Sequence, residues 1–171
     1  MRQEPREAMM KRVLALLVGG LCLVAVILLM VFTVGMRAKS PIVLNTIRKL
    51  NRTYFNPRQR DAGDPGAYAS LIRHTGRITG ALYETPVVAA ATEDGFVIAL
   101  PYGPQADWVK NVLAKGSATI VNEGLTHRVS EPQVVAIETA DPYFSAKDQR
   151  AHRIFGTREC LRTRRDEIQH A

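Results

Sequence analysis

The sequence has little cysteine, and its two cysteines lie far apart. Cys22 is in the middle of an apolar run, and Cys160 is near the C-terminus. A thiol at the centre of a membrane cannot reach a thiol of a soluble domain, so we expect no disulfide within the chain. This cysteine usage fits a reducing compartment, where structural disulfides are rare.

Several sequence motifs of enzymes and metal sites are also missing. The sequence contains no G-x-S-x-G, H-E-x-x-H, C-x-x-C, Walker or G-x-G-x-x-G motif, so the protein classes that carry these motifs are not indicated. The histidines, His74, His127, His152 and His170, are scattered without the spacing of metal ligands. We interpret each as a surface or strand histidine and predict no metal site. No segment of about 20 to 50 residues repeats, which excludes a solenoid.

Acidic residues are fewer than basic ones, 16 against 23, which gives a formal net charge of +7. The basic residues form three clusters, one before the longest apolar run, one directly after it and one near the C-terminus. These clusters are Arg2, Arg6, Lys11 and Arg12; Arg37, Lys39, Arg48, Lys49 and Arg52; and Lys147, Arg150, Arg153, Arg158, Arg162, Arg164 and Arg165. Anionic headgroups would attract the first two clusters. No nucleic-acid recognition motif accompanies the charge, so we predict a membrane partner and no nucleic acid.

The longest apolar run, Val13 to Met36, contains no charged residue. A helix of this length rises about 36 Å, which exceeds the hydrocarbon core of about 30 Å. The alternative is a removed signal peptide, but such a peptide has a shorter apolar stretch and a small-x-small cleavage site. We therefore predict a basic tail over residues 1–12 and a single-pass transmembrane anchor over 13–36. The small excess of basic residues after the run predicts a cytoplasmic soluble domain.

Residues 37–66 are predicted to form an amphipathic helix followed by a linker. Apolar residues recur at spacings near three and four, with basic residues between them. They are Ile42, Val43, Ile47, Leu50, Tyr54 and Phe55. The segment from Asn56 to Gly66 is rich in proline, glycine and charge, which is typical of a loop.

Residues 67–171 show the pattern of a small β domain. Alternating and β-branched segments bounded by turn residues predict strands over 68–74, 82–92, 96–100, 118–121, 125–129 and 132–137. A short helix is predicted over 107–115, ending at Gly116. The basic C-terminal stretch is predicted to be a helical tail in two pieces, broken at Gly156. About five or six antiparallel strands with one inserted helix favour a small barrel, since closure removes exposed strand edges.

Two segments of this domain have the residue types of an anion or ring site. His74 to Gly80 contains two glycines around a basic residue and a hydroxyl, which can form an anion-binding nest or simply a hairpin turn. Pro101 to Asn111 runs from a strand end into a helix N-terminus, where backbone N–H groups can hold a phosphate. Trp108 in this segment is either a flat wall for an aromatic ring or a core anchor.

The order and spacing of several segments resemble the deazaflavin-dependent nitroreductase family across about residues 72–132. The segments are Gly76-Arg77-Ile78-Thr79-Gly80, Thr85-Pro86-Val87, Asp94-Gly95-Phe96-Val97-Ile98-Ala99-Leu100-Pro101-Tyr102-Gly103 and Asp107-Trp108-Val109-Lys110-Asn111. The resemblance implies a split β-barrel, mainly β with flanking helices, behind the N-terminal transmembrane helix. It also implies non-covalent binding of coenzyme F420 and hydride transfer at C5 of the deazaflavin.

The resemblance assigns roles to particular residues of this chain. Arg77 and Thr79, with Gly80 beside them, would hold the cofactor phosphate. The deazaflavin ring would lie beside Pro86, Val88, Ala99 and Leu100, with the loop Pro101, Tyr102 and Gly103 against it and Trp108 and Asn111 closing it from the helix. No catalytic acid or base is identified, since the cofactor carries the hydride.

The sequence departs from the family pattern at two places. Ile78 stands where other members often have a second basic residue, and Pro101-Tyr102 stands where they often have Ser-Lys. Flavin mononucleotide (FMN) or haem on a related barrel is therefore an alternative cofactor. Three C-terminal residues, Phe144, Phe155 and Cys160, are candidates for the substrate pocket by position only.

The predicted function is reduction of a quinone-like or nitro-like acceptor by reduced F420 in a membrane-anchored enzyme. A lipid-soluble quinone suits the predicted anchor. The alternatives are a non-catalytic barrel that binds a cofactor or a partner at the membrane, and a purely structural protein that docks on lipid. The resemblance favours the oxidoreductase over these alternatives.

Overall fold

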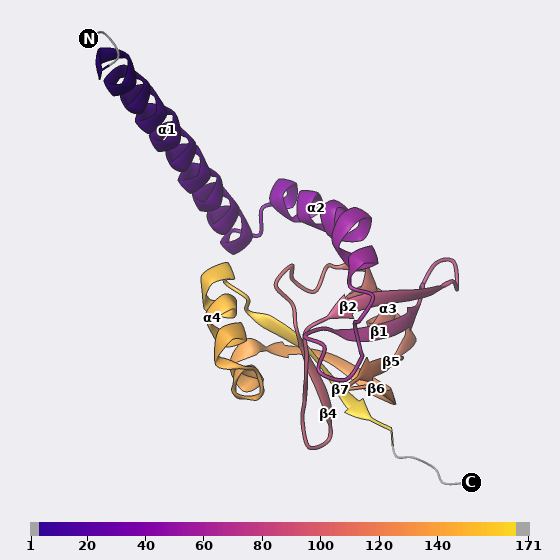
Figure 1. Ribbon diagram of the computed structural model, residues 1–171. Coiled ribbons are helices and arrows are strands. Elements are labelled where there is room, and N and C mark those ends of the chain that lie inside the picture. Colours follow the sequence, from indigo (N-terminus) through magenta and orange to yellow (C-terminus); the bar gives the residue numbers. More distant parts are fainter. Residues whose placement is uncertain (1–3, 167–171) are drawn as a thin grey trace.

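The computed structural model describes residues 4–166 of the chain. Its first element is the long helix α1 (Glu4–Arg37), which projects away from the rest of the protein (Figure 1). The segment Met9–Arg37 is long and apolar enough to cross a membrane, and its most hydropathic stretch is not buried inside the protein. The predicted run Val13 to Met36 lies within this helix.

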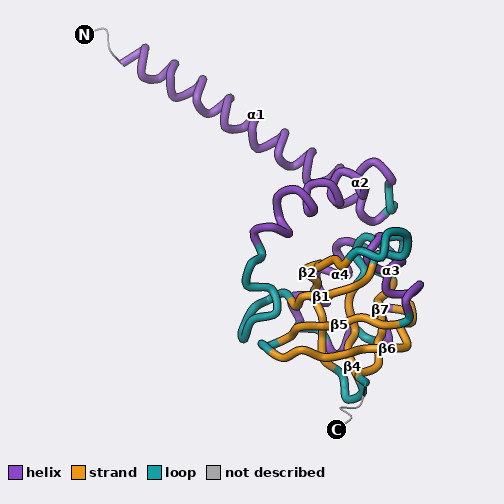
Figure 2. Tube along the Cα trace, turned by 90° about the vertical axis from the view of Figure 1, so that its right-hand side faces the viewer, coloured by secondary structure: helices purple, strands orange, loops and turns teal. Residues whose placement is uncertain are grey.

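A second helix, α2 (Pro41–Leu50), follows α1 after a short turn and continues into a π-helical turn (Asn51–Phe55) and a 3-10 turn (Asn56–Arg58). Pro41 begins α2, where its missing N–H would have no helical partner. Gly35 makes the close approach of the two helices possible, because a Cβ there would lie 2.5 Å from Cγ2 of Val43. Figure 2 shows α1 and α2 on the same side of the sheet.

A seven-stranded antiparallel sheet forms the body of the protein. Its strands are β1 (Ser70–Thr75), β2 (Leu82–Val87), β3 (Ala89–Ala91), β4 (Gly95–Ala99), β5 (Ser117–Asn122), β6 (Leu125–Ala136) and β7 (Glu159–Arg165). The strand order is β2-β1-β5-β6-β7-β4-β3, with every neighbouring pair antiparallel. The mainly β class predicted from the sequence is confirmed.

The sheet curls into a half-barrel because its two edge strands are consecutive in the sequence. β2 ends at Val87 and β3 begins at Ala89, yet these strands occupy opposite edges of the sheet. The two edges must therefore meet at Val88. The prediction of one strand over 82–92 is wrong, since the segment divides at this residue.

A β-bulge in β6 adds to the curl. Ser130 pairs with Arg164, and Gln133 pairs with Arg162. Between these two pairs, β6 therefore contains one residue more than β7. Glu131 has a φ of 51° and Pro132 follows it, as expected where a ladder is interrupted. The two predicted strands over 125–129 and 132–137 are one bent strand.

The C-terminal stretch is half helix and half strand. The helix α4 (Ala146–Phe155) ends at its C-cap residue, Gly156, which has a left-handed φ of 61°. The predicted break at Gly156 is confirmed. The second predicted helical piece is wrong, because residues 159–165 form β7 between β6 and β4. Leu161 and Thr163 are buried while Arg162 and Arg164 face solvent, so pairing on both sides prevails over helix propensity. The last residues of the predicted tail, 167–171, lie outside the described residues.

Two apolar clusters lie on the two faces of the sheet. The larger one fills the concave side, where α3 (Asp107–Lys115) packs through Val109 and Val112 against strand residues such as Ile98. The smaller one lies under the 3-10 turns Ile137–Thr139 and Asp141–Tyr143. Every residue of β4 is buried, because alternate side chains enter the two clusters.

Candidate functional site

A cavity of about 480 Å³ lies where the two sheet edges meet. Its walls come from the edge strands, the loop after β4, the start of α3, the helix α4 and the end of α1. The lining residues include Phe32, Met36, Tyr68, Pro86, Val88, Ala99, Leu100, Pro101, Tyr102, Gly103, Ala106, Trp108, Asp148, His152 and Phe155. The volume is within the range of about 300–1,000 Å³ typical of small-molecule sites.

The fold gathers most of the predicted ring contacts in this cavity. Pro86 and Val88 come from the joint of the sheet edges, and Ala99 and Leu100 from the end of β4. The sequence predicted the same residues from segments that are separate in the chain. Their common location follows from the curl, which places the end of β2 beside the end of β4.

The loop Pro101–Gly103 is held against the cavity by polar side chains from the region after α1. Lys39 Nζ donates to the carbonyl oxygen of Pro101 at 2.8 Å, and Arg48 donates to that of Tyr102 at 3.3 Å. Asn51 Nδ2 also donates to the Tyr102 hydroxyl at 3.0 Å. Burial lowers the pKa of Lys39, and nearby Glu159 partly opposes this effect. These contacts fix a loop whose glycine would otherwise allow it to move.

The predicted phosphate contacts do not line the cavity. Arg77 donates to Asn111 Oδ1 at 2.8 Å and to Asp107 Oδ1 at 3.1 Å, so its guanidinium is paired within the protein. Thr79 Oγ1 accepts from the backbone N–H of Ala81. Arg77 thus pairs with residues of α3, and neither Arg77, Thr79, Gly80 nor Asn111 is among the residues that line the cavity. Trp108 of α3 lines the cavity and also packs against the larger core cluster.

Both polar atoms of the Asn111 side chain have partners within the protein. Its side-chain oxygen accepts from Arg77, and its Nδ2 lies 3.3 Å from Nδ1 of His74. The other ring nitrogen of His74 lies 3.2 Å from Thr85 Oγ1. Burial lowers the pKa of His74, which favours a neutral ring that accepts at Nδ1 and donates at Nε2. Asn111 thus has a structural partner where the resemblance implies a cofactor contact.

The N-terminus of α3 has no side-chain cap. Its N-cap residue is Ala106, which cannot accept a hydrogen bond from the first turn. The first backbone N–H groups of a helix have no intrahelical partner, and they attract anions. Ala106 and Trp108 line the cavity, so this helix end lies between the cavity and Arg77.

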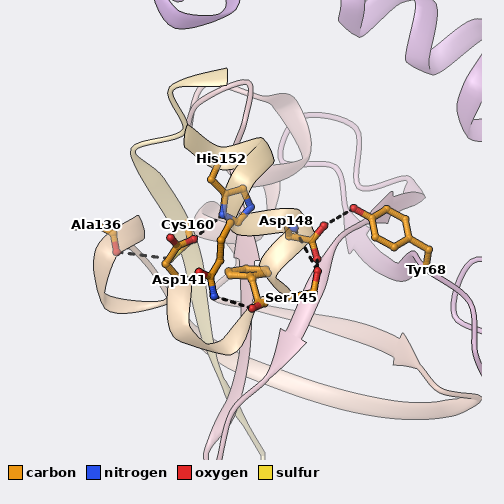
Figure 3. Close-up of polar contacts among 9 residues, drawn as sticks. Tyr68, Ala136, Asp141, Ser145, Asp148, His152 and Cys160 are labelled. Atoms are coloured by element: carbon orange, nitrogen blue, oxygen red, sulfur yellow. Dashed lines mark hydrogen bonds and ion pairs between the residues drawn. The ribbon is translucent and has the colours of Figure 1, made fainter. Parts of the chain in front are cut away.

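A second set of cavity residues was missed from the sequence (Figure 3). The Tyr68 hydroxyl donates to Asp148 Oδ1 at 2.6 Å, and the Ser145 hydroxyl donates to Asp148 Oδ2 at 2.5 Å. Desolvation raises the pKa of Asp148, but the hydrogen bonds from Ser145 and Tyr68 outweigh it and the net shift is downward. Burial and the bond to Asp148 raise the pKa of Tyr68 to about 12. The pair is therefore a carboxylate and a neutral phenol at neutral pH.

His152 is the other polar group of this wall. The residue is 8% exposed and lines the cavity, and its Nδ1 lies 2.7 Å from Asp141 Oδ1. The ring of Phe144 meets it edge-on, with centroids 4.9 Å apart. The interpretation of His152 as a surface or strand histidine is wrong, because α4 turns this side chain inward.

One local signal could have identified this wall. Ser145 caps α4 by accepting from the Asp148 N–H, which is the start pattern of a helix. Asp148 and His152 are four residues apart and so lie on one face of that helix. The pairing with Tyr68 and Asp141 has no sequence signal, because these contacts join distant segments.

The end of α1 forms part of the cavity wall. Phe32 and Met36 line the cavity, and the Phe32 ring meets that of Phe155 edge-on at 5.9 Å between centroids. Arg37 donates to the carbonyl oxygen of Arg153 at 2.8 Å. Of the three candidates by position, Phe155 lines the cavity, whereas Phe144 and Cys160 are buried in the smaller core cluster. Within residues 4–166, no group of three or more potential metal ligands is found.

Comparisons with known proteins add no assignment. No protein-family model matches the sequence, and no curated protein matches it either.

Proposed function

We propose that the protein is a membrane-anchored oxidoreductase that uses reduced coenzyme F420 to transfer hydride to a quinone-like or nitro-like acceptor. One observation carries the proposal: eight residues implied as cofactor contacts line a single cavity. They are Pro86, Val88, Ala99, Leu100, Pro101, Tyr102, Gly103 and Trp108. The half-barrel whose edges meet at Val88 supports the finer description of the fold as a split β-barrel.

The cavity residues fit the ring part of this cofactor. Pro86, Val88, Ala99 and Leu100 provide apolar walls, and Trp108 provides an aromatic face. When bound, the deazaflavin would supply a hydride, which explains why the sequence lacks the catalytic motifs of hydrolases. The walls would orient the ring and exclude water from the transfer.

Binding of the cofactor phosphate would require Arg77 to exchange one of its partners. Arg77 pairs with Asp107, whose side chain is 86% exposed, and an exposed ion pair contributes little to stability. A phosphate at the uncapped N-terminus of α3 would replace the Asp107 carboxylate as the partner of Arg77. The net charge of +7 would attract the acidic cofactor tail.

A membrane location would favour the binding of a lipid-soluble acceptor. Because Phe32 and Met36 belong both to α1 and to the cavity wall, a spanning α1 would place the cavity at the membrane surface. A lipid-soluble quinone would then enter without crossing water. The basic residues after α1 favour a cytoplasmic position for the sheet.

A second candidate is a non-catalytic barrel that carries a neutral ring at the membrane. It is favoured by the lining itself, which contains no lysine or arginine within the described part of the chain. This candidate predicts quinone binding without F420 binding or hydride transfer.

Hydride transfer to menadione, with the full-length chain in detergent, separates these candidates. We expect reduced F420 to be oxidised by menadione only in the presence of the protein. Val88→Trp, which fills the cavity, should lower this rate at least about tenfold, whereas Ala91→Trp, at the one exposed residue of β3, should not. Equal loss in both variants, or no turnover by the wild type, would contradict the proposal.

A further inference from the structure

The Asp141–His152 pair has the arrangement of an oriented acid–base group. Asp141 holds Nδ1 of His152 at 2.7 Å, and Phe144 fixes the ring from its edge. Nε2 has no hydrogen-bond partner among residues 4–166. Since the residue lines the cavity, Nε2 is the ring nitrogen available to a bound molecule. A histidine oriented at one nitrogen by a carboxylate is suited to proton transfer at the other.

The groups around His152 are consistent with this role. Asp148, one turn earlier on α4, lines the same cavity and is held by Tyr68 and Ser145. The Lys147 ammonium lies 5.1 Å from the centre of the Tyr68 ring. Asp148 already accepts two hydrogen bonds, so it is not free to donate a proton. Among these two cavity residues, His152 is therefore the one that has a ring nitrogen without a partner inside the described part of the chain.

We propose that His152 is the proton donor to the acceptor during its reduction, with Asp141 as a positioning residue. The assignment rests on the proposed function. Conversion of a quinone to a hydroquinone adds one hydride and one proton. The hydride, with its two electrons, would be supplied by the reduced deazaflavin when bound. The N–H bond at Nε2 of His152 breaks as the O–H bond of the hydroquinone forms. Water then returns a proton to Nε2.

The proposal predicts that only acceptors that need a proton depend on His152. Menadione needs one proton with its hydride. Methylene blue, a cation, becomes its neutral reduced form on gaining a hydride alone. His152→Gln should lower the menadione rate about 100-fold, the usual range for loss of a general acid. The methylene blue rate should change less than about threefold.

His127→Gln is the matched control. The His127 ring packs against Phe96 at 5.1 Å between centroids and does not line the cavity. This variant should reduce both acceptors at the wild-type rate. Equal loss with both acceptors in His152→Gln would mean a structural role for His152, and no loss with either would mean no role. Both results would overturn the assignment.

A binding measurement without cofactor gives an independent readout. Trp108 is the only tryptophan of the chain and lines the cavity, so its fluorescence should be quenched when menadione binds. The imidazole NMR signal of His152 is assigned as the one that is absent from His152→Gln. As menadione is added, this signal should shift over the same concentration range as the quenching of Trp108, while the signal of His127 stays fixed. Quenching without a shift at His152 would overturn the assignment and leave the proposed function intact. Turnover of neither acceptor by the wild type would instead overturn the proposed function and this assignment with it.

Discussion

Arg77 shows how a residue can occupy the predicted place but have a different partner. The sequence left its segment open between an anion-binding nest and a hairpin turn, and the resemblance implied a phosphate contact. In the structure, Arg77 pairs with Asp107 and Asn111 of α3. A guanidinium with a solvent-exposed partner can exchange that partner for a phosphate at small cost, since surface ion pairs contribute about 0–1 kcal/mol.

Arg77→Ala tests whether this exchange occurs. We expect the F420 affinity to fall by about 1.5–3 kcal/mol, the usual contribution of a charge-assisted hydrogen bond. Arg73→Ala is the control, because Arg73 also pairs with an exposed carboxylate, that of Glu84, but lies on β1 away from the helix end. Fluorescence titration of both variants measures the difference. An unchanged affinity in Arg77→Ala would remove this residue from the site.

The lowered pKa of Asp148 leads to a prediction for the stability of the fold at acidic pH. Its carboxylate form is favoured in the folded protein, so its pKa is lower there than in the unfolded chain. A lowered folded pKa stabilises the fold above the unfolded value of about 3.9, and this contribution is lost as the pH falls through the folded pKa.

The free energy of unfolding should therefore decrease from about pH 4 downward. Urea unfolding followed by Trp108 fluorescence measures this decrease. In Asp148→Asn the decrease should be smaller, since the amide does not titrate. An identical pH dependence in both proteins would contradict the role given to the hydrogen bonds from Tyr68 and Ser145.

The resemblance assigned roles to residues of the apolar wall of the cavity, whereas no residue of the polar wall was assigned a role. Pro86, Val88 and Trp108 lie in the part of the sequence that the resemblance covers, and they line the cavity. His152 and Tyr68 lie outside those segments. Their partners are 11 and 80 residues away, and such contacts appear only after the chain has folded.

At the scale of elements, local signals were sufficient for α3 and for strands such as β1, β4 and β5, and insufficient for β7. The helix α3 has the predicted bounds, because its apolar periodicity and Gly116 are local. The strand β7 was predicted as helix, since its arginines resemble a basic helical tail. What makes it a strand is pairing with β6 and β4, and no short window of sequence contains that information.

The β4–β7 pairing leads to a prediction at Gly95. A Cβ at this position would lie 2.0 Å from the carbonyl oxygen of Thr163, so the two strands would have to separate. Gly95→Ala should lower the free energy of unfolding by about 1–3 kcal/mol, as overpacking usually does. Asp94→Ala in the same turn removes an exposed pair with Arg162 and an exposed hydrogen bond from Thr92 Oγ1, and it should have a smaller effect. Equal effects in urea unfolding would contradict the close approach.

At the scale of the whole molecule, α1 and the sheet share the cavity. The uncharged run predicted the helix, and Figure 1 shows its C-terminal end beside α4 and α2. The sequence did not indicate that Phe32 and Met36 complete the cavity wall, because the contacts with α4 depend on the folded arrangement. Binding experiments on residues 38–171 alone would therefore lack part of the site.

The most direct test of the central claim is a titration of the full-length chain in lipid nanodiscs with F420 and, in parallel, with flavin mononucleotide. The claim predicts saturable binding of F420, seen as a change in its fluorescence and as quenching of Trp108, with much weaker binding of flavin mononucleotide. Binding of flavin mononucleotide in preference to F420, or of neither, would contradict it.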